Sequence, residues 1–214
     1  MLNPQALLTR PEALHAQVRV ALAGRDVAPR PLPPGIRRAA VLLLLVQAKG
    51  EAALLLTLRS QSVDRHKGQI SLPGGSVEPG ESPLHAALRE SGEEIGVREE
   101  DVTILGALEE EETVVSGFRL APFVGTIPYP YPLRLSAAEV HRVLEVPVRT
   151  FLDPRNLRAE LWNHDGAPRT VYFFSVEGGV VWGATARVIT QFLAAVFPNA
   201  LPPNGDRPVG RGSR

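Results

Sequence analysis

The stretch "GGSVEPGESPLHAALRESGEEIGV", residues Gly74–Val97, decides how this 214-residue chain is interpreted. A pair of glycines predicts a turn at its start. Helix signals follow: Ser82 is a suitable N-cap, Pro83 a suitable first helical residue and Gly96 a suitable C-terminus. The stretch therefore predicts a turn followed directly by a helix.

Three glutamates crowd one turn of this predicted helix. Glu90, Glu93 and Glu94 are three and four residues apart, so we expect them to point together, away from the apolar stripe that contains Leu84 and Leu88. A solvated charged face is the ordinary explanation of such a run. However, like charges at this spacing destabilise a helix by roughly 0.2–0.5 kcal/mol per pair. A divalent cation would remove the repulsion, because carboxylate oxygens suit hard ions such as Mg²⁺ or Mn²⁺.

The same stretch resembles the signature of Nudix hydrolases, G-x5-E-x7-R-E-U-x-E-E-x-G-U, in which U is aliphatic. The matching residues are Gly75, Glu81, Arg89, Glu90, Glu93, Glu94, Gly96 and Val97. Ser91 departs from the signature because it stands at an aliphatic position. Since Ser91 lies on the predicted buried stripe, the departure concerns packing rather than metal binding.

The resemblance implies catalytic roles for Glu81, Arg89, Glu90 and Glu93. Glu90 and Glu94 resemble the principal ligands of Mg²⁺ or Mn²⁺. Glu93 resembles an auxiliary ligand, or the acid that takes a proton from water. Glu81 and Arg89 resemble an ion pair that supports the loop–helix–loop shape.

Two further features near the stretch are candidates for the site. Gly74 and Gly75 form either an ordinary turn or a place where the backbone closely approaches a metal ion or a bound phosphate, which residues without Cβ allow. Glu139, in "SAAE", either closes a capping box with Ser136 or reaches the site as an extra ligand or general base.

The segment before the signature, Leu54–Gly75, resembles the additional motif of coenzyme A pyrophosphatases. The residues that match it are Leu55, Leu56, Thr57, Ser60, Gly68, Pro73, Gly74 and Gly75, while Arg59, Leu72 and Asp64 depart from it. This likeness implies hydrolysis of coenzyme A or its thioesters to 3′,5′-ADP and 4′-phosphopantetheine or its acyl derivative. Arg59, Arg65 and Lys67 then form either a solvated basic loop or the contacts to substrate phosphates.

Two other functions compete with this interpretation. One is the same chemistry on ADP-ribose, a dinucleotide or a modified nucleoside triphosphate. The other is a sensor with a Nudix fold that binds a nucleotide without cutting it. The intact set of acids favours an enzyme.

Composition limits the partners. Lys plus Arg and Asp plus Glu both number 23, so no broad attraction to nucleic acid is expected. The longest apolar run, Ala39–Val46, is far shorter than the roughly 20 residues that span a bilayer, so no membrane segment is expected. The chain has no cysteine, which fits a cytoplasmic protein. We expect a small-molecule substrate and a monomer or homodimer.

The remaining patterns predict an α/β protein. Apolar runs at 39–47 and 51–59 predict a buried hairpin, 101–110 and 118–127 a second strand pair, and 157–176 a third. The Nudix resemblance implies a mixed sheet sandwiched between helices.

The domain organisation follows from these elements. We expect an N-terminal helix and a Pro-rich linker packed on the domain over 1–37, a Nudix domain over 38–198, and a disordered tail over 199–214. A capping box of Thr9 and Glu12 is expected to start the N-terminal helix, and a closing helix is expected over 185–197.

Overall fold

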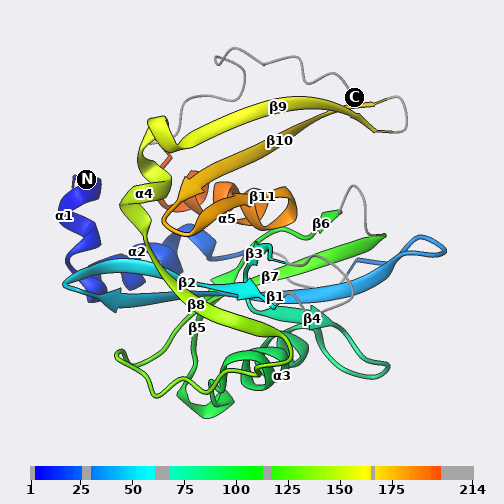
Figure 1. The fold of residues 1–214 in the computed structure, drawn as a ribbon, viewed down its shortest axis with the longest axis horizontal. Helices are drawn as coiled ribbons and strands as arrows, with labels where there is room; N and C mark the ends of the chain where they lie inside the picture. The colour runs from blue at the N-terminus through cyan, green and yellow to red at the C-terminus, as the bar shows by residue number, and fades with distance from the viewer. Residues whose placement is uncertain (1–2, 26–29, 61–67, 113–116, 165–166, 199–214) are drawn as a thin grey trace.

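The structure of the protein is a computed structural model that describes residues 3–25, 30–60, 68–112, 117–164 and 167–198 (Figure 1). The predicted tail over 199–214 therefore lies outside the described residues. Within these ranges, no helix has both the length and the apolar character needed to cross a membrane.

The described chain contains both helices and strands. In chain order they are α1 (Pro4–Leu8), α2 (Pro11–Leu22), β1 (Arg37–Ala48), β2 (Glu51–Arg59), β3 (Ile70–Ser71), β4 (Gly74–Ser76), α3 (Pro83–Ile95), η1 (Glu99–Asp101), β5 (Thr103–Ala107), β6 (Glu111–Glu112), β7 (Phe118–Thr126), β8 (Val140–Pro147), α4 (Val148–Leu152), η2 (Pro154–Asn156), β9 (Leu157–His164), β10 (Ala167–Val176), β11 (Gly179–Trp182) and α5 (Gly183–Val196).

The central sheet is mixed. Its main strand order is β3-β2-β1-β7-β5, with β4 paired to β1, β6 to β7 and β8 to β2. β1 runs parallel to β7, whereas its pairings with β2 and β4 are antiparallel. The predicted hairpin of β1 with β2 and the predicted pair of β5 with β7 are both confirmed.

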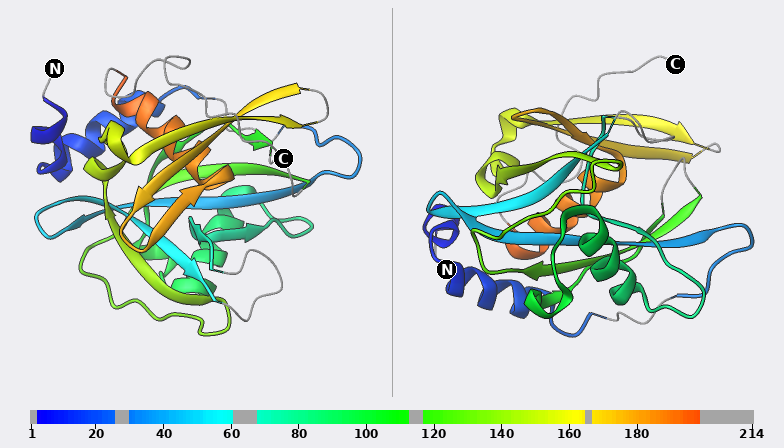
Figure 2. Two further views of the ribbon diagram at one scale, coloured as in Figure 1. Left: turned by 45° about the horizontal axis from the view of Figure 1, so that its top comes forward. Right: turned by 60° about the horizontal axis from the view of Figure 1, so that its bottom comes forward.

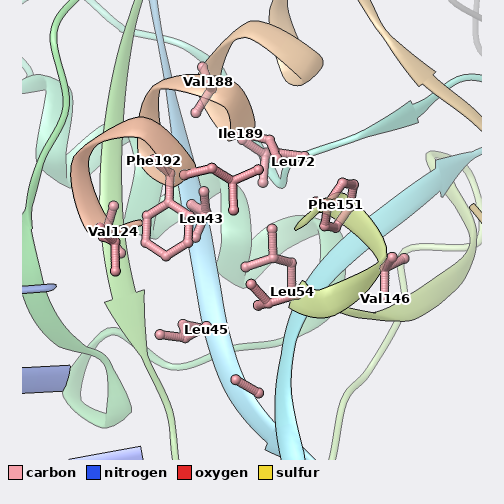
Figure 3. Close-up of a cluster of buried hydrophobic side chains, with 14 of the residues drawn as sticks. Leu43, Leu45, Leu54, Leu72, Val124, Val146, Phe151, Val188, Ile189 and Phe192 are labelled. Atoms are coloured by element: carbon pink, nitrogen blue, oxygen red, sulfur yellow. The ribbon is translucent and has the colours of Figure 1, made fainter. Parts of the chain in front are cut away.

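Successive side chains of β1 enter two different cores, because neighbouring residues of a strand point to opposite faces. Leu43 and Leu45 pack in a cluster with α5 residues such as Phe192 (Figure 3). Leu42 and Leu44 pack in a second cluster with residues of α3. Helices therefore cover both faces of the sheet, with α3 on one side and α2 and α5 on the other (Figure 2). This arrangement confirms the α/β fold class with a sheet between helices.

A second sheet of three strands, β11-β10-β9, follows the central sheet in sequence. It contains the predicted third strand pair, β9 with β10, which is confirmed. Phe174 and Val181 from this sheet are fully buried in the same cluster as α5. The predicted closing helix is confirmed as α5, with Val188, Phe192 and Val196 buried.

The N-terminal segment forms two helices rather than one, so the predicted capping box was wrong. Asn3 caps α1, and the Thr9 hydroxyl donates to the carbonyl of Ala6 at the end of that helix. Arg10 is the N-cap of α2 and makes no side-chain capping bond. The chain turns between the two helices just before Pro11, which leaves Thr9 at a C-terminus instead of an N-terminus.

The packing of α2 makes it part of the core. Leu14, Val18 and Leu22 are buried in the cluster with α5, and the Gln17 amide donates to the Val196 carbonyl at the end of α5. The apolar stripe of α2 therefore faces the core.

A matched pair of substitutions on α2 tests this packing. Val18 is 0% exposed and Val20 is 78% exposed. We expect Val18→Ala to lower the free energy of unfolding by about 2 kcal/mol, because it removes two buried methyl groups and leaves a cavity. Val20→Ala, the same change on the solvent side, should alter stability by less than about 0.5 kcal/mol in urea titrations. Equal effects of the two changes would show that α2 does not pack as described.

Candidate active site

The helix that carries the acids forms as the sequence predicts. The Ser82 hydroxyl accepts from the amide of His85 at the N-terminus of α3, and Gly96 ends the helix in the left-handed region at φ 74°. Ser91 is fully buried, and its hydroxyl donates to the Ala87 carbonyl at 2.7 Å. The departure from the signature at Ser91 therefore belongs to packing, as expected.

The glycine pair before α3 lies directly against two of its glutamates. A Cβ on Gly75 would sit 2.3 Å from the Glu90 carboxyl carbon. The amide of Gly74 donates to Glu94 Oε2 at 3.2 Å. Because β4 pairs with β1 through Gly75 and Ala40, this backbone is held by the sheet. The close approach permitted by the missing Cβ is thus an approach to the acids themselves.

Arg89 joins the loop to the helix. Its guanidinium donates to both oxygens of Glu81 at 3.0 and 3.2 Å, and to the Ser76 carbonyl at 3.1 Å. It also donates to Glu90 at 3.0 Å and to Glu93 at 3.2 Å. The structure therefore brings Glu81 and Arg89 together and places the same arginine against two of the three crowded acids.

Glu94 is the most buried of the three acids, at 3% exposed. Its Oε1 lies 3.7 Å from an Nη atom of Arg59, the last residue of β2. Glu93, by contrast, has a side chain that is 59% exposed. The expectation that all three acids point away from the buried side of the helix was therefore wrong for Glu94. This side chain turns under the glycine loop, where Gly74 and Arg59 replace the water that it loses.

Burial makes these carboxylates unfavourable as anions. It is the main cause that raises the pKa of Glu94 to about 7, against the opposing effects of Gly74 and Arg59. Burial is also the main cause that raises the pKa of Glu90. The negative charge of Glu139 raises both pKa values further. Positive charge placed among these acids would relieve the cost of ionising them.

The donor set fits a hard divalent cation, because it consists of carboxylate oxygens with unfavourable negative charge. In the part of the chain that the structure describes, no three His, Asp or Glu side chains are already arranged as a metal-binding group. Arg89 contacts Glu90 and Glu93, and Arg59 contacts Glu94. A cation held by Glu90 and Glu94 would thus compete with Arg89 and Arg59 for these carboxylates.

Glu139 lies in a turn rather than at the start of a helix. The Ser136 carbonyl accepts from the amides of Glu139 and Val140, and β8 begins at Val140. The capping-box alternative is therefore wrong. The turn is joined to the end of β2 because the Ser60 amide donates to the Glu139 carbonyl at 2.8 Å. The Glu139 side chain is exposed, and its negative charge raises the pKa values of Glu90 and Glu94, as described above.

The predicted basic stretch is only partly covered by the structure. Arg59 is the one of its three site candidates that the structure describes, while Arg65 and Lys67 lie outside the described residues. Arg59 contacts an acid of α3 rather than standing alone as a solvated loop residue.

The run of glutamates over 109–112 forms ion pairs with arginines of other elements. Glu110 pairs with Arg38 at 3.0 Å, Glu111 with Arg187 at 2.9 Å, and Glu112 with Arg119 at 2.6 Å. Arg38 and Arg187 lie far from their partners in the sequence, whereas Arg119 lies opposite Glu112 on the next strand, β7. No local pattern could have revealed the pairs of Glu110 and Glu111.

Comparisons with known proteins agree with this fold. The NUDIX domain family matches residues 36–161. The uncharacterized Nudix hydrolase NudL of Photorhabdus laumondii is 34% identical over 169 residues, which cover 78% of this chain and 89% of that protein. The NudL of Escherichia coli K12 is 35% identical over 156 residues, covering 72% of this chain and 80% of that protein.

A solved structure shows the same fold. The MutT/nudix family protein from Enterococcus faecalis superimposes with a TM-score of 0.54 at 15% identity, covering 92% of this chain and 75% of that one. The family match and the relatives make this chain a member of the Nudix hydrolases, enzymes that act on pyrophosphate bonds.

Alanine at the two glycines is expected to have different effects. At Gly75 the new Cβ meets the end of the Glu90 side chain, which can move, so Gly75→Ala should fold normally but lose at least tenfold in turnover and bind Mn²⁺ more weakly. At Gly74 the Cβ would lie 2.2 Å from the Ala40 carbonyl oxygen at a φ of 145°, so Gly74→Ala should lower the melting temperature. Thermal unfolding and Mn²⁺ titration distinguish the two effects. Normal Mn²⁺ binding by a folded Gly75→Ala protein would contradict the described contact.

The ion pair of Glu81 predicts a dependence of stability on pH. The hydrogen bond from Arg89 is the main cause that lowers the pKa of Glu81 from 4.5 to about 2. Because the folded pKa lies below the unfolded one, the ionised carboxylate stabilises the fold above about pH 4.5, and this stabilisation is lost as the pH falls through about 2. Glu81→Gln should therefore be less stable than the parent at pH 7, and the difference should shrink between pH 4.5 and 2 in urea titrations. Glu78→Gln, at an exposed neighbour, is the control and should follow the parent throughout.

Proposed function

We propose that this chain hydrolyses the pyrophosphate bond of coenzyme A or its thioesters, releasing 3′,5′-ADP and 4′-phosphopantetheine or its acyl derivative. One observation carries the proposal. The segment that resembles the coenzyme A pyrophosphatase motif ends β2 at Arg59, and Arg59 contacts Glu94 of the signature helix. Arg59 departs from the motif itself but stands within the segment that carries it, so the proposal places this segment beside the signature acids.

The residues of this site divide into three roles. Glu90 and Glu94 hold Mg²⁺ or Mn²⁺, with Glu93 as the auxiliary ligand. The cation supplies neutralisation of phosphate charge and a lower pKa for the attacking water. Glu81 and Arg89 hold the glycine loop against α3. Glu139 is a candidate for the group that takes the proton from water, because it is exposed and its charge acts on both principal ligands.

The basic side chains at the end of β2 and in the sequence after it bind the phosphates of the substrate. Coenzyme A carries a 3′-phosphate in addition to its pyrophosphate, so it offers more negative charge than ADP-ribose. Arg59 provides a planar fork for phosphate oxygens, and Arg65 and Lys67 follow in the same segment of sequence. Gly74 and Gly75 allow the backbone to approach the reacting phosphate closely.

A substrate panel tests the proposal. Purified protein in Mg²⁺ or Mn²⁺ is offered coenzyme A, acetyl-coenzyme A, ADP-ribose, a dinucleotide and a modified nucleoside triphosphate, and products are separated by chromatography. Coenzyme A or its thioester should have the highest kcat/KM. A higher value for another member of the panel would reject the substrate assignment, and binding without any product would indicate a sensor.

Neutralising Glu94 tests the ligand assignment separately. Glu94→Gln should lower kcat by at least about 100-fold at saturating Mg²⁺, because a charged ligand is lost. The fold should survive, since the amide oxygen of glutamine still accepts from Gly74 and a buried charge is removed. Circular dichroism measures the fold, and Glu99→Gln, at an exposed acid beyond the helix, is the control. Unchanged kcat in Glu94→Gln would contradict the assignment.

A further inference from the structure

The two oxygens of Glu94 have partners that differ in how firmly they are held. Oε2 accepts from the backbone amide of Gly74, which the pairing of β4 with β1 keeps in place. Oε1 faces an Nη atom of Arg59 at 3.7 Å. Because Glu94 is almost fully buried, an ion that binds Oε1 must take the place of this guanidinium.

The backbone of Arg59 is anchored, whereas its guanidinium group is held weakly. Its backbone amide donates to Gln69 at 2.9 Å, and the next residue, Ser60, is tied to Glu139, so the end of β2 is anchored. The guanidinium is held less strongly, since 3.7 Å is too long for a hydrogen bond. Its buried Nε has no hydrogen-bond partner among the residues that the structure describes. Guanidinium donors thus remain available for another anion.

Arg89 provides a contrast within the same site. Its guanidinium is tied by hydrogen bonds to Glu81, to the Ser76 carbonyl and to Glu90 and Glu93. Releasing Arg89 would break the connection between the loop and α3. Within the described ranges, releasing Arg59 would break a single long ion pair. Of these two arginines, Arg59 is therefore the one suited to exchange partners.

We propose that Arg59 is an exchangeable counter-ion: it neutralises Glu94 until a divalent cation binds there, and then turns to a phosphate oxygen of the substrate. The second half of this exchange rests on the proposed function, while the first half concerns only the protein and the cation. The exchange couples the two events, because the arginine becomes free for phosphate only when the metal has replaced it. Arg59 thus opposes metal binding and favours substrate binding.

The test measures Mn²⁺ binding without substrate, by electron paramagnetic resonance of the free ion. Arg59→Gln should bind Mn²⁺ about fivefold more tightly than the parent, the size expected from losing a competing, partly exposed ion pair. Arg142→Gln is the matched control. Arg142 lies on β8 opposite Leu58, the residue before Arg59, and its guanidinium lies against the turn at Gly178. The Arg142→Gln substitution removes the same charge and should change Mn²⁺ affinity by less than twofold.

The second measurement is steady-state hydrolysis of coenzyme A at saturating Mn²⁺. Arg59→Gln should raise KM at least tenfold, and Arg59→Lys, which keeps the charge but not the fork, should lie between it and the parent. Opposite changes in metal and substrate affinity support the exchange. A purely structural role would weaken both, so Mn²⁺ binding by Arg59→Gln that is unchanged or weaker overturns the proposal, as does an unchanged KM.

The outcome is separable from that of the proposed function. If the parent fails to cut coenzyme A, the substrate assignment fails while the Mn²⁺ titration still decides whether Arg59 competes with the ion. Unfolding curves of Arg59→Gln and Arg59→Lys establish that each variant is folded before its affinities are interpreted.

Discussion

The contact between the backbone of Gly74–Gly75 and two glutamates of α3 is the constraint on which the site depends. It removes Glu94 from water and leaves no room for a Cβ above Glu90. A buried carboxylate is costly unless it has hydrogen bonds and opposite charge nearby. The amide of Gly74 and the guanidinium of Arg59 provide both for Glu94. The same burial favours binding of a divalent cation by Glu94, because such an ion carries more charge than the Arg59 guanidinium.

The two arginines that contact the acids of this site differ in how firmly their guanidinium groups are held. Arg89 has many partners and connects the loop to the helix, so its role is structural as well as electrostatic. Among the residues that the structure describes, Arg59 has one long ion pair, and its side chain is partly exposed. An enzyme that must bind both a cation and an anionic substrate benefits from this difference, because one arginine preserves the shape while the other can change partner.

Much of the fold followed from local patterns. The continuous apolar runs of β1 and β2 predicted a strand pair buried on both faces, and the structure places alternate residues such as Leu42 and Leu43 in separate cores. Ser82 and Gly96 correctly marked the ends of α3, since capping depends on residues close in sequence. The capping box at Thr9 failed, because the same residue types also suit the end of a preceding helix.

The sequence by itself determined the class of the protein, the span of the acid-bearing helix and the residue types available for chemistry, because helix caps, apolar periodicity and motif spacing are local properties. The tertiary structure alone decided that Glu94 is buried, that Arg59 faces it and that Glu139 acts on it electrostatically. Glu110 and Glu111 show the same limit, since their arginine partners lie on β1 and α5. Burial and ion pairing depend on distances between segments far apart in the chain, and only the packing of the sheet against its helices sets those distances.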